Sequence, residues 1–83
     1  MIYRVEISRT AEKQMRHLTK TIRQRIRIHI NALRDDPYHG ASKLVGMPGF
    51  RQRVGDYRIL YRVDDNQRSA RVTAIKHRRE AYR

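Results

Sequence analysis

The residues around Gly55 and Asp56 constrain the fold more than any other stretch of the chain. Polar and apolar side chains alternate over residues 50–54 and again over residues 57–63, a period of two that is typical of half-buried strands. Glycine adopts the positive φ that a two-residue hairpin loop needs, and aspartate tolerates such a turn. The sequence therefore predicts an antiparallel hairpin with Gly55-Asp56 as its loop.

This register sorts the side chains of the hairpin onto two faces. Arg53 lies opposite Arg58, and cross-strand partners share a face. One face carries Arg51, Arg53, Arg58, Leu60 and Arg62, and the other carries Phe50, Gln52, Val54, Tyr57, Ile59, Tyr61 and Val63. Like charges placed opposite each other destabilise a strand pair. We therefore expect an anion between the arginines; the alternative is that they are solvated on an open face.

Two helices are predicted before the hairpin. Ser8 or Thr10 offers an N-cap, and a short amphipathic helix follows with the stripe Ala11, Met15 and Leu18. A longer helix is predicted over residues 20–34, ending before Pro37. Its apolar stripe comprises Ile22, Ile26, Ile30 and Leu33, widened by Ile28 and Ala32.

The remaining segments complete one domain, residues 1–83. Residues 2–7 and 70–76 alternate like strands, and residues 64–68 form a turn. Residues 38–49 are irregular, with Leu44, Val45 and Met47 as expected core contacts. The predicted order is βααβββ, an α+β fold in which two N-terminal helices pack on a small, mostly antiparallel sheet.

The charge balance favours a polyanionic partner. Lysine and arginine total 20 against 8 acidic residues, a net charge of +12 that is spread through the folded elements. The helix residues Lys13, Arg16, Arg23 and Arg27 are candidate RNA-binding residues or else a solvated face. The chain has no cysteine, and no apolar run is long enough to cross a membrane. We expect a cytoplasmic protein.

The candidate catalytic residues are basic or aromatic. The four histidines lack metal-ligand spacing, and neither a nucleotide-binding glycine loop nor a hydrolytic acid pair is present, so no metal or cofactor is expected. The candidates are Arg51, Arg53, Arg58, His77, Arg78 and Tyr82. This set suits metal-free RNA cleavage, in which the 2′-OH attacks the adjacent phosphate and cations stabilise the oxyanion. His77 is a candidate for proton transfer, and Tyr82 can stack on a base.

Two motifs on a βααβββ chain resemble the RelE/ParE toxin superfamily. They are Val54-Gly55-Asp56-Tyr57-Arg58-x-x-Tyr61 and His77-Arg78-x-x-x-Tyr82. The resemblance implies the toxin of a type II toxin–antitoxin pair. RelE-type members cut mRNA in the ribosomal A site without a metal, and so inhibit translation. ParE-type members poison DNA gyrase and usually lack the full basic and tyrosine set, which this chain keeps.

The resemblance also implies a role for each residue. Arg51 and Arg53 match two basic residues of the first hairpin strand, and Arg58 matches a phosphate-binding arginine. Arg78 matches the arginine implicated as acid or charge stabiliser, and Tyr82 the tyrosine that orients or stacks on the nucleotide. Some relatives have lysines at the first two positions, and arginine is a poor base. Either electrostatics alone activates the 2′-OH or His77 transfers the proton; alternatively, His77 props Arg78.

The implied partners are the ribosome, mRNA and a smaller, acidic antitoxin that folds onto the toxin. Such a toxin–antitoxin hetero-oligomer can bind operator DNA. The leading hypothesis is thus a metal-independent endoribonuclease. The alternatives are a gyrase inhibitor on the same fold and a non-catalytic RNA-binding module.

Overall fold

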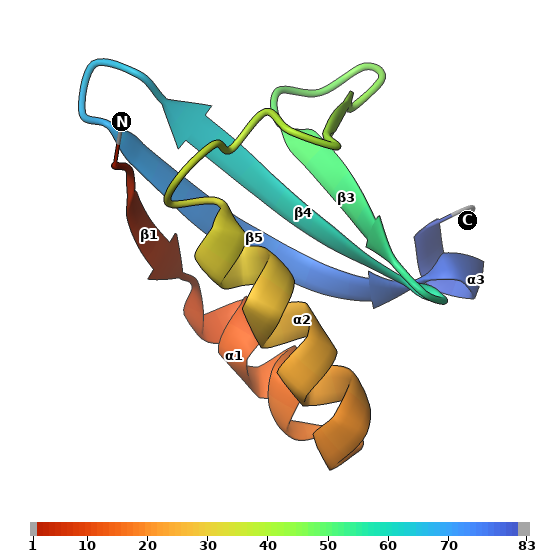
Figure 1. Cartoon of the computed structure of the whole chain (residues 1–83). Helices are drawn as coiled ribbons and strands as arrows, with labels where there is room; N and C mark the ends of the chain where they lie inside the picture. Colours follow the sequence, from red (N-terminus) through yellow and green to blue (C-terminus); the bar gives the residue numbers. More distant parts are fainter. Residues whose placement is uncertain (1, 82–83) are drawn as a thin grey trace.

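The computed structural model describes residues 2–81, which form one mixed sheet with two helices packed on it (Figure 1). The elements are β1 (Arg4–Ile7), α1 (Arg9–Arg16), α2 (Lys20–Ala32), β2 (Ser42–Lys43), β3 (Phe50–Val54), β4 (Tyr57–Asp64), β5 (Ser69–His77) and α3 (Arg78–Ala81). The strand order is β1-β5-β4-β3-β2, with β1 parallel to β5 and the other pairs antiparallel. The α+β prediction is confirmed. The structure adds β2 and α3, which are too short to have a recognisable periodicity.

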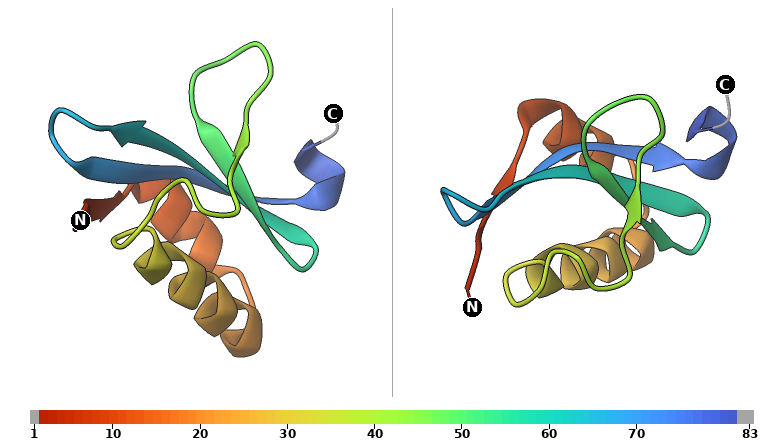
Figure 2. Two further views of the ribbon diagram at one scale, coloured as in Figure 1. Left: turned by 45° about the horizontal axis from the view of Figure 1, so that its top comes forward. Right: turned by 90° about the horizontal axis from the view of Figure 1, so that it is seen from above.

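Side-chain caps define where the two long helices begin. The Ser8 Oγ accepts a hydrogen bond from the Ala11 N–H at 3.1 Å, and the Thr19 Oγ1 accepts one from the Ile22 N–H at 3.4 Å. Each cap satisfies a backbone donor that has no partner within its helix. Residues 17–19 then turn the chain, so that α1 and α2 lie side by side and antiparallel (Figures 1 and 2).

The predicted helix stripes meet the sheet in one hydrophobic core. The buried residues are Ala11, Met15, Ile26, Ile30, Leu33, Val54, Ile59, Tyr61, Ala70, Val72 and Ile75. The prediction that Ile28 widens the α2 stripe is wrong, because its residue surface is 67% exposed. Two helical positions correspond to a rotation of about 200°, so Ile28 points away from the core that Ile26 and Ile30 reach. Ala32 is exposed as well.

The segment between β2 and β3 arches away from the sheet (Figure 2). Val45 and Met47 are 98% and 59% exposed, so the prediction that they contact the core is wrong. The Leu44 N–H donates to the Gly49 carbonyl at 3.0 Å and closes the loop on itself. Gly49 has φ +119°, and a Cβ there would lie 2.9 Å from the Tyr61 carbonyl oxygen. A glycine is therefore needed where this loop rejoins the sheet.

Tyr61 fastens the chain after α2 to the sheet. Its ring is fully buried, its hydroxyl donates to the Pro37 carbonyl at 2.6 Å, and it accepts from the Gln52 side-chain amide at 3.3 Å. The same amide donates to the His39 carbonyl at 2.8 Å. Burial raises the pKa of Tyr61, so the hydroxyl remains a donor. These bonds fix residues 37–39 beside β3.

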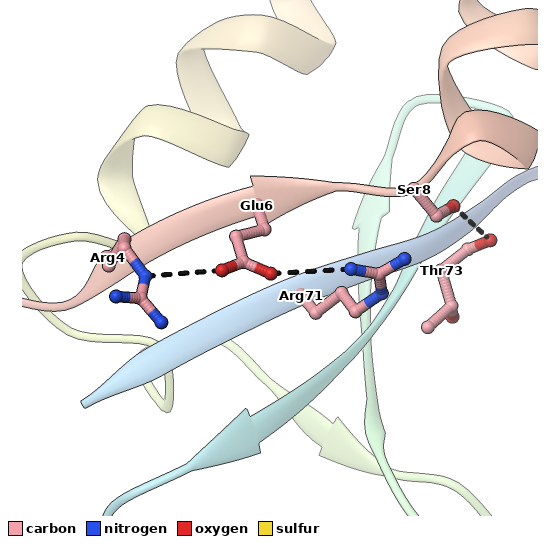
Figure 3. A network of polar contacts seen from close by, with 5 residues as sticks. All are labelled: Arg4, Glu6, Ser8, Arg71 and Thr73. Atoms are coloured by element: carbon pink, nitrogen blue, oxygen red, sulfur yellow. Dashed lines mark hydrogen bonds and ion pairs between the residues drawn. The ribbon is translucent and has the colours of Figure 1, made fainter. Parts of the chain in front are cut away.

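Polar contacts hold β1 against β5 on the open face of the sheet. The Glu6 carboxylate lies 3.2 Å from the Arg4 guanidinium and 3.3 Å from that of Arg71 (Figure 3). At the end of the strand, the Ser8 hydroxyl donates to the Thr73 carbonyl at 3.0 Å. Exposed ion pairs contribute little stability on their own. The Arg4–Glu6 pair lies within β1, whereas the Glu6–Arg71 pair and the Ser8–Thr73 hydrogen bond connect the two segments.

Strand β5 contains a bulge. Leu60 lies opposite Ala74, but Tyr61 lies opposite Val72, so Thr73 is an extra residue in the ladder. The Thr73 hydroxyl donates to the Leu60 carbonyl at 3.2 Å, and this bond takes the place of the interrupted ladder.

The helices of the described residues are too short and too polar for any of them to span a bilayer.

At the turn between β4 and β5, the Asp65 carboxylate accepts hydrogen bonds from the hydroxyls of Tyr3 at 2.7 Å and Tyr38 at 2.8 Å. Both bonds lower the pKa of Asp65 below its ordinary 3.8, and the bond from Tyr3 has the larger effect. The unfolded chain therefore takes up this proton at a higher pH than the folded chain does. The stabilisation is complete above about pH 5 and is lost as the pH falls.

Replacing Asp65 by asparagine should remove this pH dependence. In urea titrations from pH 6 to 3, the free energy of unfolding should fall less for Asp65→Asn than for wild type; identical profiles would contradict this.

Removing the Tyr61 hydroxyl should destabilise the fold. Tyr61→Phe leaves the buried Pro37 carbonyl without its donor, and we expect a loss of about 1–3 kcal/mol in the free energy of unfolding. Tyr57→Phe is the matched control: this tyrosine is on the same sheet face, and its hydroxyl has no partner among the described residues. Its effect should stay within about 0.5 kcal/mol. Equal losses in the two variants, measured by urea unfolding, would refute the role of the Tyr61 hydroxyl.

Candidate functional site

The hairpin adopts the predicted register. Val54 pairs with Tyr57, Arg53 with Arg58, and Arg51 with Leu60. Gly55 has φ +59°, the left-handed conformation that such a loop needs. The arginines consequently point away from the helices, on the opposite face to Ile59 and Tyr61, whose side chains are in the core.

Arg51, Arg53 and Arg58 line a single hollow of about 290 Å³, together with Gly40 and Ser42. We call it the arginine pocket. Strand β2 forms one wall, because Ser42 pairs with Arg51. Arg58 is buried, whereas Arg51 and Arg53 are exposed. Three guanidinium groups around one hollow provide a site for a phosphate, since arginine stays protonated and its planar fork matches phosphate oxygens.

Sequence reasoning missed Lys76. It lies opposite Arg58 on β5, on the same sheet face, and is half-buried. Its ammonium group adds a further cation to this face, next to Arg58. The only indication in the sequence was the pairing of the hairpin with residues 70–76, but the bulge at Thr73 makes that register impossible to count from alternation alone.

Arg78 lies next to the turn of the hairpin, at the end of β5. It begins α3, which lies beside the β3–β4 turn (Figure 1). Its N–H donates to the Asp56 carbonyl at 2.7 Å, and its guanidinium lies 3.8 Å from the Asp56 carboxylate. Arg78 does not line the arginine pocket. Tyr82, the other predicted C-terminal residue of the site, is outside the described residues.

His77 lies across the sheet from the arginines. It pairs with Tyr57, whose face is the helix-covered one, and the two rings meet edge to face with their centroids 5.2 Å apart. Its Nδ1 accepts a hydrogen bond from the Arg79 N–H at 3.2 Å, at the start of α3. These contacts are those of a residue that positions the chain leading to Arg78.

The basic residues of the helices form a separate cluster. Arg16, Arg23 and Arg27 line a hollow of about 200 Å³ between α1 and α2, together with Ile7, Glu12 and Met15. Lys13 is exposed on α1 and does not line it. This cluster and the arginine pocket share no lining residue. Three of the four candidate RNA-binding residues therefore form a second basic area, and Lys13 is not part of its lining.

The chemistry available in the arginine pocket is charge stabilisation. The three arginines and Lys76 lie on one sheet face, at the end near the β3–β4 turn. Among residues 2–79, whose side chains the structure describes, no three histidine, aspartate or glutamate side chains come together in a way that could hold a metal ion. Fixed cations of this kind bind a phosphodiester and stabilise the negative charge that develops on it during attack.

The family comparison covers nearly the whole chain. A family model described as the ParE toxin of a type II toxin–antitoxin system, parDE, matches residues 5–82. A comparison with curated proteins gives no match.

Solved toxin structures share the fold. A chain of the RelBE2 toxin–antitoxin complex from Mycobacterium tuberculosis superposes with a TM-score of 0.82 at 25% identity, over 93% of this chain and 99% of that one. The archaeal RelE-RelB complex from Pyrococcus horikoshii gives 0.80 at 28% identity, over 94% and 97%. The intact E. coli RelBE complex gives 0.79 at 26% identity, over 90% and 95%.

An anion in the arginine pocket should stabilise the protein. Sulfate binds only the folded state there, so it should raise the melting temperature above that in chloride of the same ionic strength. Arg53→Gln removes the charge opposite Arg58; in chloride we expect a gain of about 0.2–1 kcal/mol and a smaller response to sulfate. Lys13→Gln is the control and should respond like wild type. An equal sulfate response in all three proteins would indicate general salting rather than a site.

Proposed function

Since this chain belongs to the RelE/ParE toxin superfamily of type II toxin–antitoxin systems, we propose that it cuts mRNA on the ribosome and so inhibits translation. The observation that carries the proposal is the arginine pocket, where Arg51, Arg53 and Arg58 surround one hollow. A protein that acted only through protein–protein contact would have no need to place like charges opposite each other, since this destabilises the strand pair.

In the proposed reaction, the 2′-OH gives its proton to water and attacks the adjacent phosphorus, and the 5′-oxygen of the next nucleotide leaves and takes a proton from water. Arg53 and Arg58 hold the non-bridging oxygens, and their charge stabilises the dianionic transition state. Arg51 and Lys76 extend the same cationic face on either side. The products of such an attack are a 2′,3′-cyclic phosphate and a 5′-hydroxyl. Because DNA has no 2′-OH, the reaction is specific for RNA.

Activation of the 2′-OH is electrostatic in this proposal. Arginine is a poor base, and the position of His77 across the sheet favours a structural role over proton transfer. Arg78 is only loosely paired, at 3.8 Å from an Asp56 side chain that is itself 66% exposed. It is therefore available to exchange Asp56 for the phosphate or the leaving oxygen. We assign Tyr82 to orienting or stacking on the nucleotide.

The proposal includes a cognate antitoxin. The solved neighbours include toxin–antitoxin complexes, and a chain of net charge +12 suits an acidic partner. Such a partner would cover basic surface and silence the toxin, and the complex would bind operator DNA. The cluster of Arg16, Arg23 and Arg27 then contacts ribosomal RNA in the free toxin, with a strong dependence on salt.

A second candidate function is inhibition of DNA gyrase. The observation that favours it is the family model, which is that of a ParE toxin. The two candidates differ in their consequences for the cell, because one breaks mRNA and the other leads to breaks in DNA.

A brief induction separates the two. We expect new 5′ ends within translated messages, mapped by primer extension, with intact DNA. Arg53→Gln should lower the rate of mRNA cleavage about 10²–10³-fold, the effect of removing one charge-stabilising donor, and should still fold because Arg53 is exposed. Arg34→Gln, at an exposed arginine that lines neither basic hollow, is the matched control and should cleave like wild type. Double-strand DNA breaks with intact mRNA would refute the nuclease and establish the second candidate. If induction causes neither mRNA cleavage nor DNA breaks, the non-catalytic RNA-binding module remains as the function.

A further inference from the structure

A second hollow opens beside the arginine pocket. It has a volume of about 660 Å³, within the range of sites for small ligands, and it lies between α2 and residues 35–40. It shares Gly40 and Arg53 with the arginine pocket, so the two hollows meet at these residues. We call it the α2 groove.

The lining of the α2 groove is apolar where α2 forms it. Ile28 and Ala32 contribute aliphatic surface, and Ile28 is 67% exposed although it is a large apolar residue. His29 and His39 also line the groove. An apolar surface beside histidine residues suits a flat, partly apolar group, since nucleobases pack on such surfaces in many RNA-binding sites.

The wall formed by residues 35–40 is held in place. The Asp36 carboxylate accepts from the Tyr38 N–H at 2.9 Å, and Gln52 donates to the His39 carbonyl at 2.8 Å. Asp35, in contrast, makes no side-chain hydrogen bond or ion pair to any described residue. The groove thus offers one free carboxylate on a fixed wall, ready to accept hydrogen bonds from a ligand.

Charge divides the two adjoining hollows. Among the lining residues that the structure describes, those of the arginine pocket include three cations and no acid, whereas the α2 groove adds two carboxylates, those of Asp35 and Asp36. A ligand that spans both must be anionic at one end and must carry a neutral, planar, hydrogen-bond-donating group at the other. A nucleotide has this distribution of charge.

We propose that the α2 groove binds the base of the nucleotide whose phosphate occupies the arginine pocket. This inference rests on the proposed function, because it takes the polyanion to be RNA. Asp35 accepts from the exocyclic amino group of the base, which cytosine, adenine and guanine have and uracil lacks. The groove therefore selects amino-bearing bases at the bound position.

The same groove could receive an apolar side chain of a protein partner. The charges favour the base, because a chain of net charge +12 pairs best with an acidic protein, and Asp35 and Asp36 repel such a partner at this position. Antitoxin binding is therefore the competing outcome in the experiment.

The experiment titrates the purified toxin with ribose 5-phosphate, CMP and UMP, followed by NMR chemical shifts. We expect CMP to bind about tenfold more tightly than ribose 5-phosphate, within the range that one stacked base contributes. UMP should fall between the two. If CMP shows no gain over ribose 5-phosphate, the inference is overturned.

Three variants locate the effect. Ala32→Phe fills the groove from an exposed helix position and should remove the gain of CMP without weakening ribose 5-phosphate. Asn31→Phe, the exposed neighbour on α2 that does not line the groove, should behave as wild type. Asp35→Asn should bring CMP and UMP closer together even if Ala32→Phe fails to fold. An unchanged CMP preference in Asp35→Asn would overturn the role of Asp35.

The remaining outcomes separate this inference from the proposed function. If ribose 5-phosphate fails to bind wild type, the phosphate site and the inference both fall. If CMP binds as expected but no mRNA is cut in cells, the nuclease fails and the base groove stands. If Ala32→Phe weakens the antitoxin complex and leaves CMP binding intact, the groove is a protein-docking site and the inference is overturned.

Discussion

The opposition of Arg53 and Arg58 across a strand pair is the constraint on which the rest of the molecule depends. A strand pair with like charges in register is held together only if its other face is well packed. Here the opposite face carries Ile59 and Tyr61, both buried under the helices. Burial of Arg58 adds a further cost, because a charge is transferred into a poorly hydrated environment. The hydrophobic core therefore offsets the electrostatic penalty of the site across the thickness of a single sheet.

The arginine pocket and the α2 groove share a wall that the core also stabilises. Residues 37–40 have no regular structure, yet Tyr61 and Gln52 hold them through the carbonyls of Pro37 and His39. Gln52 and Tyr61 belong to the two strands that carry Arg53 and Arg58. One hairpin thus supplies cations on one face and hydrogen-bond anchors on the other. Side-chain hydrogen bonds therefore hold this irregular segment against the sheet.

Much of this arrangement could be predicted from the sequence, because local rules determine it. Gly55-Asp56 fixed the hairpin register, and with it the placement of Arg51, Arg53 and Arg58 on one face. The predictions failed where tertiary contacts decide: Ile28 has the right composition for a core residue but the wrong angular position. Val45 and Met47 are apolar but lie in a loop that closes on itself. The α2 groove was not predicted at all, since it depends on how residues 35–40 return toward β3.

The bulge at Thr73 has a consequence for the geometry of the whole sheet. Before it, the even-numbered residues Ala70 and Val72 face the core; after it, the odd-numbered Ile75 does so. The extra residue acts as a phase shift of half a period in the strand. A strand without it, aligned with the core at Val72, would turn Lys76 into the hydrophobic interior. Because of the bulge, β5 contributes core residues on both sides of Thr73 and still places Lys76 on the face of the arginines.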